Sequence, residues 1–231
     1  MSKLNVDDAI LVVVDFQEKL YPAMSGKETA AQQTAKLIKG CRLLGIPIIA
    51  TQQYTKGLGE TIDDIKDALT VKLDENVQET EFKYIEKKTF SCMADPDFKE
   101  ALIKSGREQV ILCGIESHIC VMQTAIDLYE YGDEDDYDED TYEFDAENSK
   151  DNNVVVLIDR DDEEDEEYTG ADFEVYLTCD CVTSRSEYDK DISIKRMSDM
   201  GMEMMTAESA LFEMTHGSEN PVFKQISKTV K

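Results

Sequence analysis

The sequence is poor in several residue types, and each shortage excludes a class of protein or site. Its 231 residues include no tryptophan, four prolines and two histidines, and 24 Lys and Arg stand against 51 Asp and Glu. The net charge of −27 argues against nucleic acid or an anionic membrane surface as a partner, because phosphates are bound by basic surfaces. Only two histidines, His118 and His216, could join cysteines in binding zinc, so we expect no structural zinc site. No apolar run approaches the roughly 20 residues that a membrane-spanning helix needs.

The N-terminus and the cysteines together predict where the protein resides. The first eight residues are mostly polar and lead into an apolar run, so we expect no signal peptide. We therefore expect an intracellular, cytoplasmic protein whose cysteines stay reduced. These are Cys41, Cys92, Cys113, Cys120, Cys179 and Cys181.

Acidic residues are concentrated in one stretch of the chain. Residues 133–172 contain 20 of the 51 acidic residues and 2 of the 24 basic ones, so this stretch carries −18 and the rest of the chain −9. Such a composition favours solvated, mostly disordered chain. One apolar run at 154–158 interrupts it, and we expect a strand there that pairs with 173–178 as a hairpin at a sheet edge. The stretch is predicted to be an acidic insertion into a single domain that covers residues 1–231.

Strand-like and helix-like patterns alternate along the rest of the chain. Strands are predicted at residues 9–14, 46–51, 82–86, 109–115, 173–178 and 202–205, several of them as continuous apolar runs typical of strands buried on both faces. Helices are predicted at residues 27–44, 95–104, 119–131, 186–200, 207–215 and 220–230. This order predicts the α/β fold class, as a three-layer αβα sandwich with a mostly parallel, Rossmann-like sheet.

One cysteine follows the strand predicted at 109–115. After Gly114 and a short polar turn, Cys120 opens an apolar, helix-like segment. A helix N-terminus at the carboxyl end of a strand favours the thiolate form of a cysteine, and open α/β sheets bind their ligands at that edge. Cys120 is therefore a better candidate nucleophile than the other five cysteines.

Two charged residues end other predicted strands and are expected at the same edge. Asp15 follows the run at 9–14, and Lys87 follows the run at 82–86. Asp15 can accept the thiol proton, while Lys87 can hold Asp15, favour the thiolate and polarise a carbonyl. Spacing alone leaves ordinary roles open, since carboxylates at strand ends often cap loops, adjacent lysines are usually solvated and buried cysteines are usually inert.

These residues lie within a set of motifs that resembles a known family. The chain looks like a member of the isochorismatase-like cysteine hydrolase superfamily, and within it is most similar to the eukaryotic isochorismatase-domain-containing proteins. The motifs occur in family order: Val-Val-Asp-Phe-Gln at 13–17, Ala-Thr-Gln-Gln-Tyr at 50–54 with Lys-Gly-Leu-Gly at 56–59, Glu-Lys-Lys-Thr-Phe-Ser at 86–91, Cys-Gly-Ile-Glu at 113–116 through Cys-Val at 120–121, Asp180 with Ser-Arg-Ser at 184–186, and Asn-Pro-Val-Phe-Lys at 220–224.

The resemblance implies a role for several residues. It implies a catalytic triad of Asp15, Lys87 and Cys120, with Lys87 a better match to the family lysine than Lys88. It also implies a cis peptide bond before Glu116 that aims the backbone N–H groups of Glu116 and Cys120 at a substrate oxygen, as an oxyanion hole.

Candidate substrate-binding residues follow from the same motifs. They are Gln53, Tyr54, Glu116 and His118, which favour a small polar ligand. His118 either lines the pocket or is a partly exposed turn histidine, and both interpretations stay open. Nicotinamidases carry a metal-binding Asp-x-His-x-His cluster in the region of residues 52–59, where this chain has no histidine, so we expect no catalytic metal and no cofactor.

The expected activity is hydrolysis of a small amide-like C–N bond through an acyl-thioester on Cys120. Cleavage of a vinyl ether, as in isochorismatase, is less favoured because that chemistry does not need the thiol. The resemblance also implies a homo-oligomer. The alternative is a non-catalytic family member that binds a basic partner through its acidic insertion.

Overall fold

A computed structural model describes residues 2–73, 82–131 and 173–231. Its centre is a six-stranded sheet in the order β3-β2-β1-β4-β5-β6, in which each strand of the described chain pairs with its neighbours in parallel. The strands are β1 (Ala9–Val14), β2 (Ile48–Gln53), β3 (Phe82–Lys87), β4 (Gln109–Ile115), β5 (Glu174–Thr183) and β6 (Glu203–Met205). The predicted α/β sandwich with a mostly parallel sheet is confirmed.

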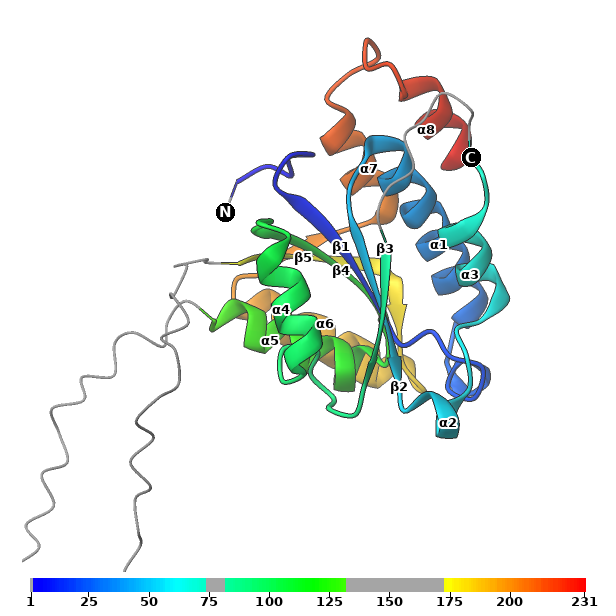
Figure 1. Ribbon diagram of the computed structural model, residues 1–231, viewed down its shortest axis with the longest axis vertical. Coiled ribbons are helices and arrows are strands. Elements are labelled where there is room, and N and C mark those ends of the chain that lie inside the picture. The colour runs from blue at the N-terminus through cyan, green and yellow to red at the C-terminus, as the bar shows by residue number, and fades with distance from the viewer. Residues whose placement is uncertain (1, 74–81, 132–172) are drawn as a thin grey trace, which may run out of the picture.

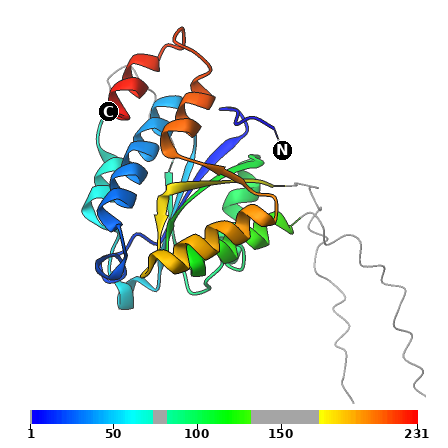
Figure 2. The same cartoon turned by 180° about the vertical axis from the view of Figure 1, so that it is seen from behind.

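Helices cover both faces of the sheet, as Figure 1 and, from behind, Figure 2 show. One layer consists of α1 (Lys27–Leu44), α3 (Asp63–Thr70), α7 (Ala207–Thr215) and α8 (Phe223–Thr229). The other consists of α4 (Pro96–Lys104), α5 (Met122–Tyr129) and α6 (Glu187–Asp199). Three short elements lie in connections: η1 (Tyr21–Ala23), α2 (Thr55–Leu58) and the π-helical turn η2 (Ser117–Val121).

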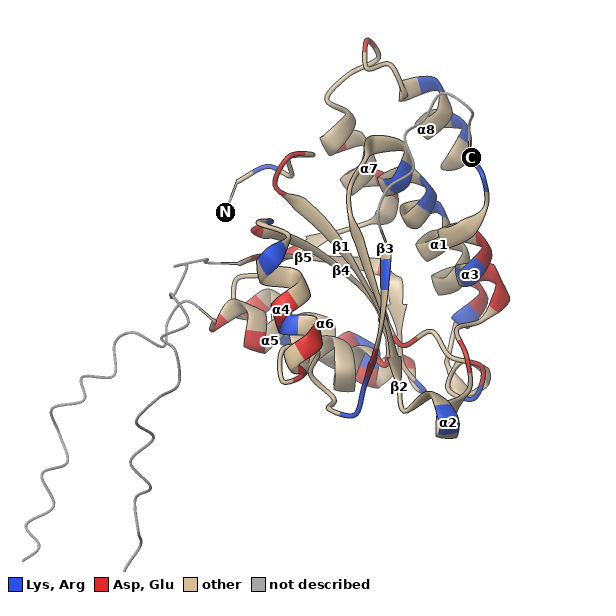
Figure 3. Ribbon diagram, in the orientation of Figure 1, with Lys and Arg blue, Asp and Glu red and all other residues tan. Residues whose placement is uncertain are grey.

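The strand β1 shows why an unbroken apolar run is needed at the centre of this sheet. Ala9, Leu11 and Val13 pack into the core beneath α1 and α3, whereas Ile10, Val12 and Val14 pack into the core beneath α4 and α5. Because successive side chains of a strand point to opposite faces, a strand with both faces covered must be apolar at every position. Figure 3 shows the charged residues mainly on the helices and connections, with the central strands free of them.

The helix boundaries follow the local signals in the sequence. Asp95 caps α4, since its carboxylate accepts a hydrogen bond from the Phe98 N–H at 3.2 Å. Gly45 ends α1 with φ of 78°, a left-handed conformation that glycine adopts without a steric cost.

Several boundaries differ from the expectation. The helix predicted at 119–131 begins as the π-helical turn η2 and continues as α5, and the strand predicted at 173–178 extends to Thr183. The helices α2 and α3 were not predicted, because a four-residue helix and a helix of eight residues give little periodic signal.

The acidic insertion predicted at 133–172, with its strand at 154–158, lies outside the described residues. Its expected partner already has neighbours on both sides: Tyr176 and Leu177 of β5 pair with both β4 and β6. Where the chain leaves and returns, the rings of Tyr131 and Phe173 pack with centroids 5.4 Å apart.

Candidate active site

Asp15 and Lys87 form a buried ion pair at the carboxyl end of the sheet. Asp15 directly follows β1 and Lys87 is the last residue of β3, so only β2 separates their strands. The Lys87 Nζ lies 2.7 Å from Asp15 Oδ2, and both side chains are fully shielded from solvent. Asp15 has φ of 51°, a left-handed conformation in which the chain leaves the strand. The fold thus brings together these two charged residues, which the sequence places at the ends of separate strands.

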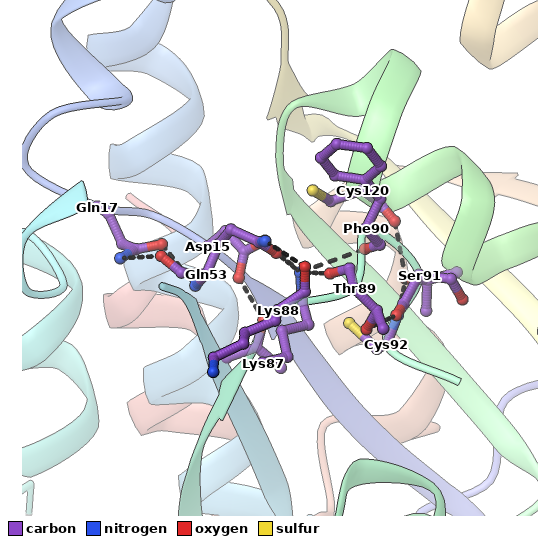
Figure 4. Close-up of polar contacts among 12 residues, drawn as sticks. Asp15, Gln17, Gln53, Lys87, Lys88, Thr89, Phe90, Ser91, Cys92 and Cys120 are labelled. Atoms are coloured by element: carbon purple, nitrogen blue, oxygen red, sulfur yellow. Dashed lines mark hydrogen bonds and ion pairs between the residues drawn. The ribbon is translucent and has the colours of Figure 1, made fainter. Parts of the chain in front are cut away.

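Further hydrogen bonds hold the ion pair in place (Figure 4). Thr51 Oγ1 donates to the second oxygen of the Asp15 carboxylate at 2.7 Å. The ammonium of Lys87 has three more acceptors: Gln53 Oε1 at 2.8 Å, the carbonyl of Thr89 at 3.1 Å and the carbonyl of Phe90 at 3.2 Å. Burial lowers the pKa of Lys87, but the charge of Asp15, followed by Cys92 and Cys120, raises it by more, so that the net pKa lies above its ordinary value. Lys87 is therefore a fixed cation.

Cys120 lies close enough to this ion pair for both charges to act on its thiol, which is protonated. Burial raises the pKa of Cys120 to about 12, and the neighbouring Asp15 carboxylate adds to the rise by charge and by hydrogen bond, whereas Lys87 lowers it. The expectation that this position favours a thiolate is therefore wrong. Cys120 lies inside the π-helical turn rather than at an exposed helix start, and only 7% of the residue is accessible, so loss of hydration outweighs the helix dipole. The thiol can become a nucleophile only when a base removes its proton.

The turn between β4 and Cys120 has an unusual backbone. The peptide bond between Ile115 and Glu116 is cis, as the resemblance implied. Gly114 has φ of 137°, and a Cβ there would lie 2.3 Å from the Val14 carbonyl oxygen, so no other residue fits. The N–H groups of Ile119 and Val121 both donate to the Glu116 carbonyl, which closes the turn.

The side chains of the candidate substrate-binding residues are engaged to different degrees. Gln53 is used within the protein, because its Oε1 accepts from Lys87 and its Nε2 donates to the Lys88 carbonyl at 2.9 Å. Tyr54 is 48% exposed and its ring covers Gly57, where a Cβ would lie 2.2 Å from the ring. The Glu116 carboxylate accepts a 2.6 Å hydrogen bond from Arg185 Nε. Gln53 is thus a support for Lys87, whereas Tyr54 still has an exposed face.

His118 takes part in a chain of buried hydroxyl groups. Its Nδ1 lies 2.9 Å from Ser184 Oγ, which lies 2.5 Å from Ser117 Oγ. Ser193 Oγ donates to Ser117 Oγ at 3.1 Å. His118 is half-buried, which agrees with either interpretation of this residue.

Sequence reasoning missed several residues that surround the ion pair. Cys92 is fully buried, and burial raises the pKa of its thiol to about 12. Thr124 of α5, also fully buried, contacts the backbone of both cysteines. Only contact in three dimensions distinguishes these from ordinary core residues, and no local signal in the sequence marks them.

The described part of the chain contains neither a metal-binding cluster nor a membrane-spanning helix. Within 2–73, 82–131 and 173–231, no group of three or more His, Cys, Asp or Glu is arranged to hold a metal ion. In that same part of the chain, no helix is both long and apolar enough to cross a membrane.

Comparison with known proteins identifies the family of this chain and relates its fold to solved structures. The isochorismatase domain family matches residues 9–134. An isochorismatase domain-containing protein 1 of Danio rerio is 26% identical over 232 residues, covering 100% of this chain and 64% of that protein, so the chain spans less than two thirds of that relative. A solved structure of MAR1 ribonuclease from Caenorhabditis elegans is 28% identical with a TM-score of 0.72, covering 99% of this chain and 92% of that one.

The fold is shared more widely than the sequence. The structure of YcaC from Escherichia coli, an octameric hydrolase of unknown specificity, has a TM-score of 0.71 at 16% identity and covers 99% of this chain and 91% of that one. Because the family match spans more than half of the chain and the motifs and the fold agree with it, this protein belongs to the isochorismatase family of hydrolases.

Proposed function

We propose that the protein is a cysteine-dependent hydrolase that cleaves an amide-like C–N bond in a small polar molecule. The observation that carries the proposal is the buried Asp15–Lys87 ion pair, 2.7 Å between charged atoms, with the thiol of Cys120 against it. A base, a fixed cation and a protonated thiol in one place have a chemical use, whereas a buried ion pair does little for stability.

The reaction begins with transfer of the Cys120 proton to Asp15. The sulfur then attacks the substrate carbonyl carbon, and the N–H groups of Glu116 and Cys120 stabilise the resulting oxyanion. When the tetrahedral intermediate collapses, the C–N bond breaks and the proton on Asp15 passes to the leaving nitrogen, which leaves an acyl-thioester. Asp15 next takes a proton from water, whose oxygen adds to the thioester carbonyl carbon. When the C–S bond breaks, Asp15 returns that proton to the sulfur, which restores the thiol and releases a carboxylic acid.

Lys87 holds the Asp15 carboxyl group in position through this cycle. It also favours each state in which negative charge moves onto the sulfur, since Lys87 is the group that lowers the pKa of Cys120. The Lys87 ammonium is kept in place by its hydrogen bonds to Gln53 and to the carbonyls of Thr89 and Phe90, so it does not move toward the substrate.

Two other activities fit the site less well. Vinyl ether cleavage does not need a thiol held beside a base. Ribonuclease activity, the activity named for the Caenorhabditis elegans neighbour, needs a surface that attracts phosphates, and this chain carries a net charge of −27.

The proposal is tested with a panel of small primary amides and Cys120→Ala. Loss of all turnover in Cys120→Ala is expected, with Cys179→Ala as a matched control because Cys179 is the one other described cysteine that is not fully buried. Full activity in Cys120→Ala would rule out the covalent mechanism. Absence of turnover in the wild type with every amide would favour the non-catalytic alternative.

We also infer that the chain forms a homo-oligomer. The support is the octamer described for the Escherichia coli neighbour of the same fold. Light scattering on the purified protein tests this, and a monomeric mass at micromolar concentration would contradict it.

A further inference from the structure

Thr124 connects two segments that lie far apart in the sequence. Its Oγ1 donates to the carbonyl of Cys120 at 2.7 Å and accepts the N–H of Cys92 at 2.9 Å. The residue is fully buried on α5, so water cannot replace either bond. One hydroxyl group therefore sets how close the backbone of Cys92 lies to the backbone of Cys120.

The Cys92 side of this contact belongs to the segment that holds the lysine. The chain runs from Lys87 to Cys92 in a tight loop whose carbonyls at Thr89 and Phe90 accept from the Lys87 ammonium. Within the loop, Thr89 Oγ1 donates to the Ser91 carbonyl at 2.7 Å. A loop braced in this way moves as a unit, so a shift at Cys92 is transmitted to Lys87.

A second route leads from Cys92 to the base. The thiol of Cys92 is close enough to Thr51, Lys87 and Asp15 for each to affect its pKa, and Thr51 donates to Asp15 at 2.7 Å. Cys92 thus lies near both members of the ion pair, and Thr124 joins its backbone to that of Cys120.

We infer that Thr124 is a positioning residue whose hydroxyl holds Cys120 at a fixed place relative to the Lys87–Asp15 pair. This inference rests on the proposed function. It predicts that the reactivity of Cys120 depends on the hydroxyl group of Thr124 and not on the volume of its side chain. An ordinary core threonine would instead contribute through its volume.

The test compares Thr124→Val, which keeps the shape and removes the hydroxyl, with Thr124→Ser, which keeps the hydroxyl. Thr215→Val is the matched control, because Thr215 is also buried in a helix and donates to the carbonyl four residues earlier, at 2.6 Å, but lies on α7. The first measurement is the pH profile of Cys120 alkylation by iodoacetamide, read by mass spectrometry. This readout does not need a substrate.

Because Lys87 favours the thiolate of Cys120, Thr124→Val should slow alkylation at pH 9 by about three- to tenfold, while Thr124→Ser and Thr215→Val stay near the wild type. With an amide that is turned over, kcat of Thr124→Val should fall about 10- to 100-fold with little change in KM, since displacements on the order of 1 Å have effects of that size.

A wild-type alkylation profile in Thr124→Val would overturn the inference, as would a Thr124→Ser variant as impaired as Thr124→Val. If Thr124→Val does not fold, Thr124→Ala takes its place, and unfolding of both while Thr124→Ser folds would show a structural role instead. Failure of the proposed function is a separate result, seen as undiminished turnover in Cys120→Ala.

Discussion

The Nζ atom of Lys87 lies 2.7 Å from Oδ2 of Asp15, and neither side chain is exposed to solvent. Two charges buried together cost hydration free energy that their attraction offsets only when both are present. Replacing either residue alone should therefore lower the free energy of unfolding by more than replacing both.

Lys87→Met should destabilise the protein by about 3–5 kcal/mol and abolish turnover, because the Asp15 carboxylate is left buried without its cation. Lys87→Met with Asp15→Asn should be more stable than Lys87→Met alone, although equally inactive. Urea unfolding of the wild type, both single variants and the double variant measures the coupling. Additive changes in the free energy of unfolding would show that the ion pair does not exist in solution.

Asp15→Asn should separate the reactivity of Cys120 from catalysis. Removal of the carboxylate takes away a charge that raises the pKa of Cys120 and leaves Lys87 to lower it, so alkylation near pH 8 should rise by about tenfold or more. Hydrolysis should nevertheless be lost, because no base remains to activate water. Peptide mapping after iodoacetamide treatment reports Cys120, with the half-buried Cys179 as the internal reference. Slower alkylation of Cys120 in this variant would contradict the assignment.

Stability should decline at alkaline pH. The pKa of Cys92 and the pKa of Cys120 are each raised by burial from 9.0 to about 12 in the folded chain. Below pH 9 both thiols are protonated in the folded and in the unfolded chain, so their contribution to the free energy of unfolding is fully present. Between pH 9 and 12 the unfolded chain releases protons that the folded chain retains, so the free energy of unfolding falls by up to about 1.4 kcal/mol per pH unit for each thiol.

Urea unfolding between pH 7 and 10.5 measures this slope. Cys120→Ala should lose one thiol's share of it. The same slope in Cys120→Ala and the wild type would show that Cys120 is not buried as a thiol.

Removal of the acidic stretch should leave the domain folded. The rings of Tyr131 and Phe173 are 5.4 Å apart, so a short glycine-serine linker can join the chain in place of residues 133–172. Circular dichroism, the thermal midpoint and Cys120 alkylation of this variant should match the wild type. Loss of cooperative unfolding would mean that the stretch is part of the core. If the shortened protein folds but no longer binds a basic partner that the wild type binds, the non-catalytic alternative is favoured.

The alternation of strands and helices could be read from the sequence because it is local. The continuous apolar run at β1 requires a covered strand whatever surrounds it, and Asp95 and Gly45 act through neighbouring backbone groups. The positions of Asp15, Lys87 and Cys120 at strand ends also followed, since parallel strands bring their carboxyl ends to one edge.

What only the tertiary structure decided depends on contacts between distant segments. The pKa of Cys120 is raised by burial and by the Asp15 charge, and neither could be read from the helix start on which local sequence reasoning relied. Gln53 accepts a hydrogen bond from Lys87, and Thr124 joins the lysine loop to the backbone of Cys120. Hydration and hydrogen-bond partners belong to the folded surroundings of a residue, and a residue's neighbours in the chain do not contain that information.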